Sequence, residues 1–106
     1  MTASGGFYCD MTAMSPKQRG RYDALRAKLE ASVVAVYELP NGYALQLRTG
    51  SFVVAELAAF VIYEKRCCPF LELMLDGSPD SPGLRITGRD GVKEFIRAEF
   101  SAIKFE

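Results

Sequence analysis

The longest apolar stretch of the chain, residues 52–62, predicts a helix that ends at Cys67 or Cys68. Its apolar side chains occur on nearly all sides of a helix, so we expect it to be central or to cover another subunit. Glu56 is the only charge within this stretch. Pro69 cannot continue a helix and disfavours helical geometry in the residue before it. The pattern therefore places two adjacent thiols at a helix end.

Three patterns predict the elements before this helix. Residues 5–11 alternate apolar and polar side chains, which predicts a short strand with Cys9 pointing inward. A Ser-Pro-x-Gln capping box begins a helix over 16–31. A Pro-Asn-Gly turn between the runs 33–39 and 43–47 predicts a hairpin. The first helix has Tyr22, Leu25 and Leu29 on its packing face and Lys17, Arg19, Arg21, Arg26 and Lys28 largely on its wet side.

The pattern after residue 69 predicts two more strands and a last helix. A strand over 70–75, a polar loop over 76–83 and a return strand over 84–87 lead into a helix over 91–103. The expected order is β-α-β-β-α-β-β-α. We therefore expect one α+β domain over 1–106, a mainly antiparallel sheet with helices on one face, in a ferredoxin-like or related topology.

Composition narrows the classes of partner. The chain is 49% apolar and carries 13 basic and 13 acidic side chains, so no net charge draws it to nucleic acid or to an anionic membrane. No apolar run is long enough to span a membrane, and residues 1–6 lack the basic start and apolar region of a signal peptide. An odd cysteine count with two adjacent members is typical of thiols kept reduced, so we expect a cytoplasmic protein.

The absence of histidine removes the usual general base at neutral pH and the Ser/His and Cys/His nucleophile pairs. We therefore expect a binding protein rather than an enzyme.

The cysteines carry the leading hypothesis. Residues three and four apart share a helix face, so Glu64 lies beside Cys67 and Cys68. If the strand with Cys9 pairs near the strand after Pro69, the Cys9 thiol lies close to Cys67 and Cys68. Three soft sulfur ligands favour Cu(I), Zn(II), Hg(II) or As(III), with Glu64 as a nearby carboxylate. The sequence therefore predicts a small protein that binds a soft metal or metalloid ion.

Two other interpretations of the cysteines stay open. Free cysteine often packs as a small apolar side chain. In that case the protein is a homodimeric interaction module or a small-ligand-binding module. Cys67 and Cys68 could also carry out redox chemistry, through a vicinal disulfide or one reactive thiolate. Lys65 and Arg66 would lower the pKa of a neighbouring thiol, whereas a helix C-terminus would raise it, so neither thiol is predicted to be activated.

The sequence leaves two environments open for the carboxylate of Glu56. A buried unpaired carboxylate is expensive, so Glu56 either pairs with an arginine at an edge or lies in a pocket near the tyrosines.

The chain also resembles a group of small uncharacterised bacterial proteins. The shared features are an early cysteine before a helix (residues 8–15), an Asn-Gly hairpin followed by Tyr-Ala-Leu, a Glu-[Lys/Arg]-x-Cys-Cys-Pro-Phe motif at 64–70 and Gly-Val-Lys-Glu-Phe at 91–95. No established activity accompanies this group. The resemblance implies that Cys9, Glu64, Cys67 and Cys68 are the positions to test first.

Overall fold

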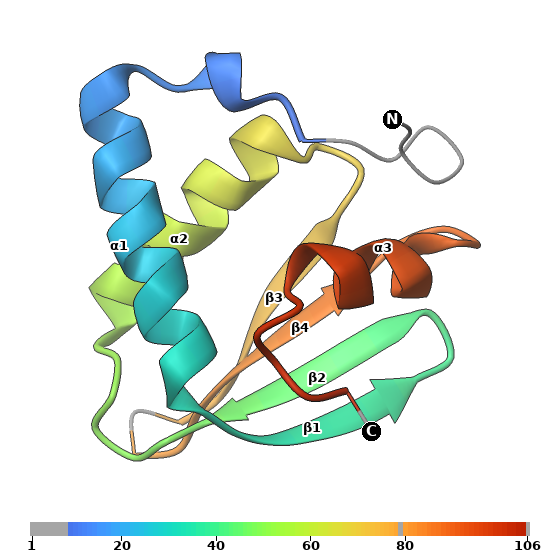
Figure 1. Cartoon of the computed structure of the whole chain (residues 1–106). Helices are drawn as coiled ribbons and strands as arrows, with labels where there is room; N and C mark the ends of the chain where they lie inside the picture. Colours follow the sequence, from blue (N-terminus) through green and yellow to red (C-terminus); the bar gives the residue numbers. More distant parts are fainter. Residues whose placement is uncertain (1–8, 79, 106) are drawn as a thin grey trace.

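A four-stranded antiparallel sheet carries the helices on one of its faces in the computed structural model, which describes residues 9–78 and 80–105 (Figure 1). The elements are a 3-10 helix η2 (Met11–Ala13), α1 (Pro16–Ser32), β1 (Val33–Leu39), β2 (Gly42–Leu47), α2 (Val54–Cys67), β3 (Glu72–Gly77), β4 (Pro82–Thr87) and α3 (Val92–Glu99). The predicted α+β class is confirmed.

The strand order is β1-β2-β4-β3, and every neighbouring pair is antiparallel. The strands β2 and β3 therefore run parallel, are connected by α2 and are separated by β4. This split βαβ unit is the hallmark of ferredoxin-like folds. The hairpin predicted at residues 33–47 supplies β1, which lies at the outer edge beside β2.

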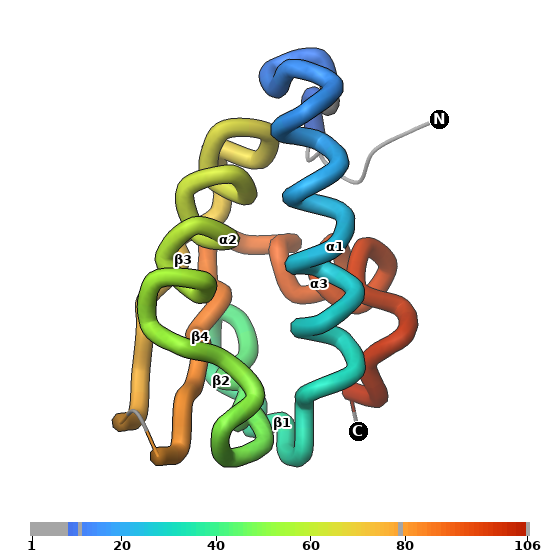
Figure 2. Tube along the Cα trace, turned by 90° about the vertical axis from the view of Figure 1, so that its left-hand side faces the viewer, coloured from blue at the N-terminus to red at the C-terminus, as the bar shows by residue number. Residues whose placement is uncertain are grey.

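The core lies between the sheet and its helices. Tyr43, Leu45 and Leu47 alternate along β2 toward the helices and are buried. The helices α1 and α2 lie side by side over this face (Figures 1 and 2), and the ring of Tyr22 stacks on that of Phe60 with centroids 5.9 Å apart. No helix of the described residues covers the opposite face of the sheet, which we call the open face.

The predicted first strand is wrong for the part that the structure describes. Of residues 5–11, the first four lie outside the described residues. Asp10 accepts a hydrogen bond from the backbone N–H of Thr12 at 3.0 Å, which caps a 3-10 turn over Met11–Ala13. Aspartate side chains offer the backbone such a local alternative to strand pairing. Two helix boundaries also shift, because α2 begins at Val54 and α3 ends at Glu99.

The capping box at the start of α1 is confirmed. The hydroxyl of Ser15 accepts from the N–H of Gln18 at 3.2 Å, and the side chain of Gln18 accepts from the N–H of Ser15 at 3.0 Å.

We expect Ser15→Ala to lower the free energy of unfolding by about 1 kcal/mol, because it removes this cap. Chemical denaturation of both proteins measures the difference. Ser101→Ala is the matched control, since Ser101 is exposed and lies after the last helix. Equal stability of the two variants would show that the cap contributes nothing.

Candidate functional site

The last turn of α2 brings a carboxyl group and two cysteine sulfurs into the core. Glu64, Cys67 and Cys68 all have 0% exposed surface. Cys68 caps the helix, and its N–H donates to the carbonyl of Glu64 at 2.7 Å. Lys65 donates to the carbonyls of Pro69 and Leu71, at 3.2 and 2.7 Å, and so holds the turn after the helix. The predicted placement of the thiols at a helix end is confirmed.

Cys9 reaches this helix end and is joined to it by a disulfide. The bond links Cys9 to Cys68, with Cα atoms 4.7 Å apart. Beside it, the N–H of Asp10 donates to the carbonyl of Cys67 at 2.7 Å. The expectation of three reduced thiols is therefore wrong for this state of the protein. It rested on the odd cysteine count, which does not show which two cysteines the fold brings together.

Cys67 stays a free thiol next to the disulfide. Its Sγ lies 3.7 Å from the Sγ of Cys68 and 3.6 Å from the carbonyl oxygen of Glu64, to which it donates. Burial, and then the charge of Glu64, raise the pKa of the Cys67 thiol to about 11. Lys65 and Arg66, which were expected to lower this pKa, are not among the causes of its shift, and the thiol is neutral at physiological pH.

Four side-chain atoms of types that bind metals converge at this point. One atom from each of Cys9, Glu64, Cys67 and Cys68 lies within 4.8 Å of the other three. We call this group the four-donor cluster. Cys9 is its only partly exposed member, so it forms the side nearest to solvent.

The carboxyl group of Glu64 is only half satisfied. Tyr22 donates its hydroxyl proton to Oε1 at 2.7 Å, whereas Oε2 is buried and has no hydrogen-bond partner among the described residues. Burial raises the pKa of Glu64, while the hydrogen bond from Tyr22 and the charge of Arg26 act in the opposite direction. An unpartnered buried oxygen is rare and calls for a reason, such as a ligand that it faces.

A hydrogen-bonded chain continues from Glu64 toward the surface. Arg26 donates to the hydroxyl of Tyr22 at 3.1 Å and to Oε2 of Glu99 at 2.8 Å. Its guanidinium also lies 4.6 Å from the ring centroid of Phe100. The sequence pattern places Tyr22 in the core and Arg26 on the wet side of α1. It assigns neither residue a role at the site, because their partners lie far along the chain.

Glu56 has a lysine partner and is not a pocket carboxylate. Lys28 donates to its two oxygens at 2.9 and 3.0 Å, and the N–H of Val53 donates to Oε1 at 3.2 Å. The bond from Lys28 lowers the pKa of Glu56. The predicted ion pair at an edge is therefore correct in kind, but its cation is Lys28 rather than an arginine.

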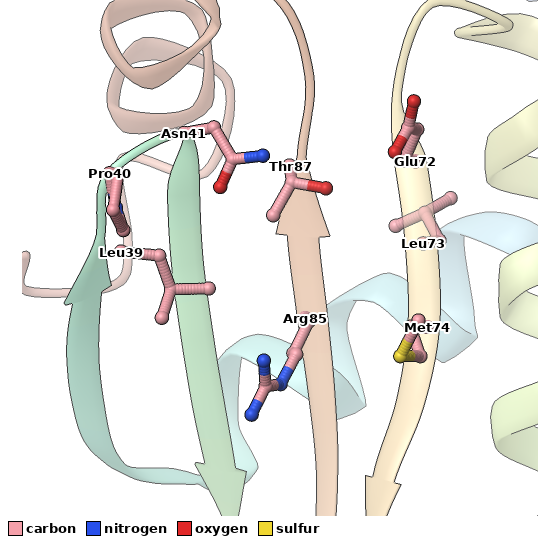
Figure 3. Close-up of a pocket in the computed structure, with 8 residues that line it drawn as sticks. All are labelled: Leu39, Pro40, Asn41, Glu72, Leu73, Met74, Arg85 and Thr87. Carbon is pink, nitrogen blue, oxygen red and sulfur yellow. The ribbon is translucent and has the colours of Figure 1, made fainter.

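A shallow hollow of about 330 Å³ lies on the open face of the sheet (Figure 3). Arg85 and Thr87 of β4 occupy its middle, between the β1–β2 turn and β3. The complete lining is Leu39, Pro40, Asn41, Glu72, Leu73, Met74, Arg85 and Thr87. It combines apolar side chains with charges of both signs.

Within the described part of the chain, no helix has the length and apolar character needed to cross a membrane. No family model, curated protein or solved structure matches the chain.

Proposed function

We propose that the reduced protein binds a soft metal or metalloid ion through Cys9, Cys67 and Cys68, with Glu64 beside the ion. The observation that carries the proposal is the convergence of these four donors within 4.8 Å, from two segments 59 residues apart. Thiolates select soft ions, which makes Cu(I), Zn(II), Hg(II) and As(III) the candidates. The unpartnered oxygen of Glu64 is a second supporting feature.

The Cys9–Cys68 disulfide makes this binding depend on the redox state. Two of the three sulfurs are tied to each other in the oxidised protein and cannot both act as thiolate ligands. Reduction returns all three to the thiol form. The binding-competent protein therefore belongs in a reducing compartment, and we propose the cytoplasm.

Titration of the reduced protein with each of the four ions tests the proposal. The protein is reduced with a phosphine, which is then removed under nitrogen, and its thiols are counted with Ellman's reagent before and after each ion. We expect one ion per chain and a slower reaction of all three thiols, since the buried Cys67 and Cys68 react only when the fold opens. The double variant Cys67→Ser/Cys68→Ser should bind at least about 100-fold more weakly, because two of its ligands are lost.

Two controls accompany the titration. The oxidised protein should not bind, and Glu56→Gln, a change on the same helix outside the cluster, should bind as the unchanged protein does. Unaltered affinity in the double cysteine variant would refute the proposed site.

We propose a homodimer, or a module that binds a small ligand on its open sheet face, as the second candidate function. The supporting observation is the hollow in Figure 3, whose lining residue Met74 is 63% exposed. Tyr37 is 56% exposed and lies in register with Met74 across the sheet. Sedimentation velocity at micromolar concentration tests the dimer. We expect a dimer that Met74→Glu converts to a monomer, and a monomeric unchanged protein would exclude it.

A further inference from the structure

The charges around the four-donor cluster limit which ion it can hold. Its three innermost side chains have no exposed surface. Among the described residues, no lysine or arginine forms an ion pair with Glu64. Arg26 reaches the cluster only through the hydroxyl of Tyr22, and its charge is matched by Glu99. Lys65 is bound to two carbonyl oxygens.

A buried complex with a net charge is costly when no opposite charge is near. A divalent ion on three thiolates leaves one negative charge, and a carboxylate as the fourth ligand leaves two. A monovalent ion on three thiolates also leaves two. A trivalent ion on three thiolates leaves none. The cluster offers three sulfurs, one carboxyl group and no cation, and its three thiolates are the set that a trivalent ion neutralises.

We infer that the ligand of the four-donor cluster is a trivalent metalloid, As(III) or Sb(III), held by the sulfurs of Cys9, Cys67 and Cys68. This inference rests on the proposed function and narrows it to one class of ligand. In water these elements exist as uncharged trihydroxides, so the approaching species is neutral as well. Entry and bound state both avoid placing a charge in the core.

The binding step is a condensation in which no electrons are transferred. Each thiol forms one bond from sulfur to the metalloid and displaces one hydroxide, which leaves with the thiol proton as water. Three thiols and one trihydroxide thus give a neutral tris-thiolate and three waters. The step requires earlier reduction of the Cys9–Cys68 bond by a thiol or a phosphine, which places one proton on each sulfur.

Glu64 distinguishes this ligand from a divalent ion. A pyramidal tris-thiolate is complete with three sulfurs, so the unpartnered Oε2 of Glu64 lies beside the metalloid as a weak secondary contact and not as a fourth ligand. Zn(II) needs a fourth ligand for its tetrahedral site, and the Glu64 carboxylate is the available one. Replacement of Glu64 should therefore affect the two ions to different extents.

The test measures the affinities of the reduced, phosphine-free chain for arsenite, Zn(II) and Hg(II), with intact-mass spectrometry of each complex. We expect one arsenic atom bound with loss of three hydrogens, and absorption from sulfur-to-arsenic charge transfer. Cys67→Ala should weaken arsenite binding by at least about 100-fold. Cys9→Ala, at the partly exposed end of the cluster, provides the same test with less change to the core. Glu64→Gln should raise the preference for arsenite over Zn(II) by about tenfold, whereas Glu56→Gln should leave it unchanged.

Each outcome separates this inference from the proposed function. Binding of Zn(II) or Hg(II) without arsenite overturns the inference and leaves the proposed function standing. Binding of none of the three ions overturns both. Arsenite binding with fewer than three hydrogens lost, or an arsenite affinity that falls in Glu64→Gln as far as in Cys9→Ala, contradicts the assigned donor set.

Discussion

Cys9→Ser is expected to lower the free energy of unfolding of the oxidised protein by about 2–4 kcal/mol. The Cys9–Cys68 disulfide joins residues 59 positions apart, so it closes a loop that contains more than half of the chain. Such a link stabilises chiefly by restricting the unfolded ensemble, and the effect grows with loop length.

Guanidinium denaturation of both proteins, with and without a phosphine, measures this contribution. With the phosphine, the unchanged protein should lose most of its advantage over Cys9→Ser, because neither protein then has the bond. The same difference under both conditions would assign the effect to the packing of the Cys9 side chain.

Glu64→Gln is expected to stabilise the ion-free protein at neutral and alkaline pH by about 1–3 kcal/mol. Glutamine keeps an oxygen that can accept from Tyr22 and removes a buried charge. Burial raises the pKa of Glu64, so the folded protein holds this proton more tightly than the unfolded chain. The unchanged protein therefore loses stability as the pH rises from the ordinary value of 4.5 through the raised pKa.

The advantage of Glu64→Gln should accordingly grow with pH in this window and be smallest in acid. Denaturation midpoints at a series of pH values measure it. Glu56→Gln is the matched control with the opposite sign, since Lys28 lowers the pKa of Glu56 and its charged form is the favoured one. If the difference in unfolding free energy between Glu64→Gln and the unchanged protein did not vary with pH, the Glu64 carboxyl group would have the same pKa in the folded and unfolded states.

Local signals in the sequence predicted most of the fold. The Ser15 capping box, the hairpin at residues 33–47 and the stop at Pro69 each depend on residues a few positions apart, and the structure has all three. The predicted strand over 5–11 fails in its described part for an equally local reason. The alternation of side chains predicted a strand, but the Asp10 side chain accepts a hydrogen bond from the N–H of Thr12 and so favours a turn.

The candidate site was only partly visible in the sequence. Helical spacing put Glu64 beside Cys67 and Cys68, and the structure brings them together. The arrival of Cys9 and the hydrogen bond from Tyr22 could not be predicted, because both join segments more than 40 residues apart. They depend on how α1 and α2 pack, which no spacing rule encodes. The resemblance to a bacterial group and the bound ion stay predictions.

The direction of α2 has a consequence for the ions that the proposed site would exclude. This helix ends at the cysteines, so the negative end of its dipole points at the cluster. Helix N-termini attract phosphate, and this end does the opposite. Phosphate and arsenate are anions at neutral pH, so the negative end of the helix repels them. The uncharged trihydroxide of As(III) is not repelled. In the proposed site, the orientation of this helix would therefore favour As(III) over arsenate.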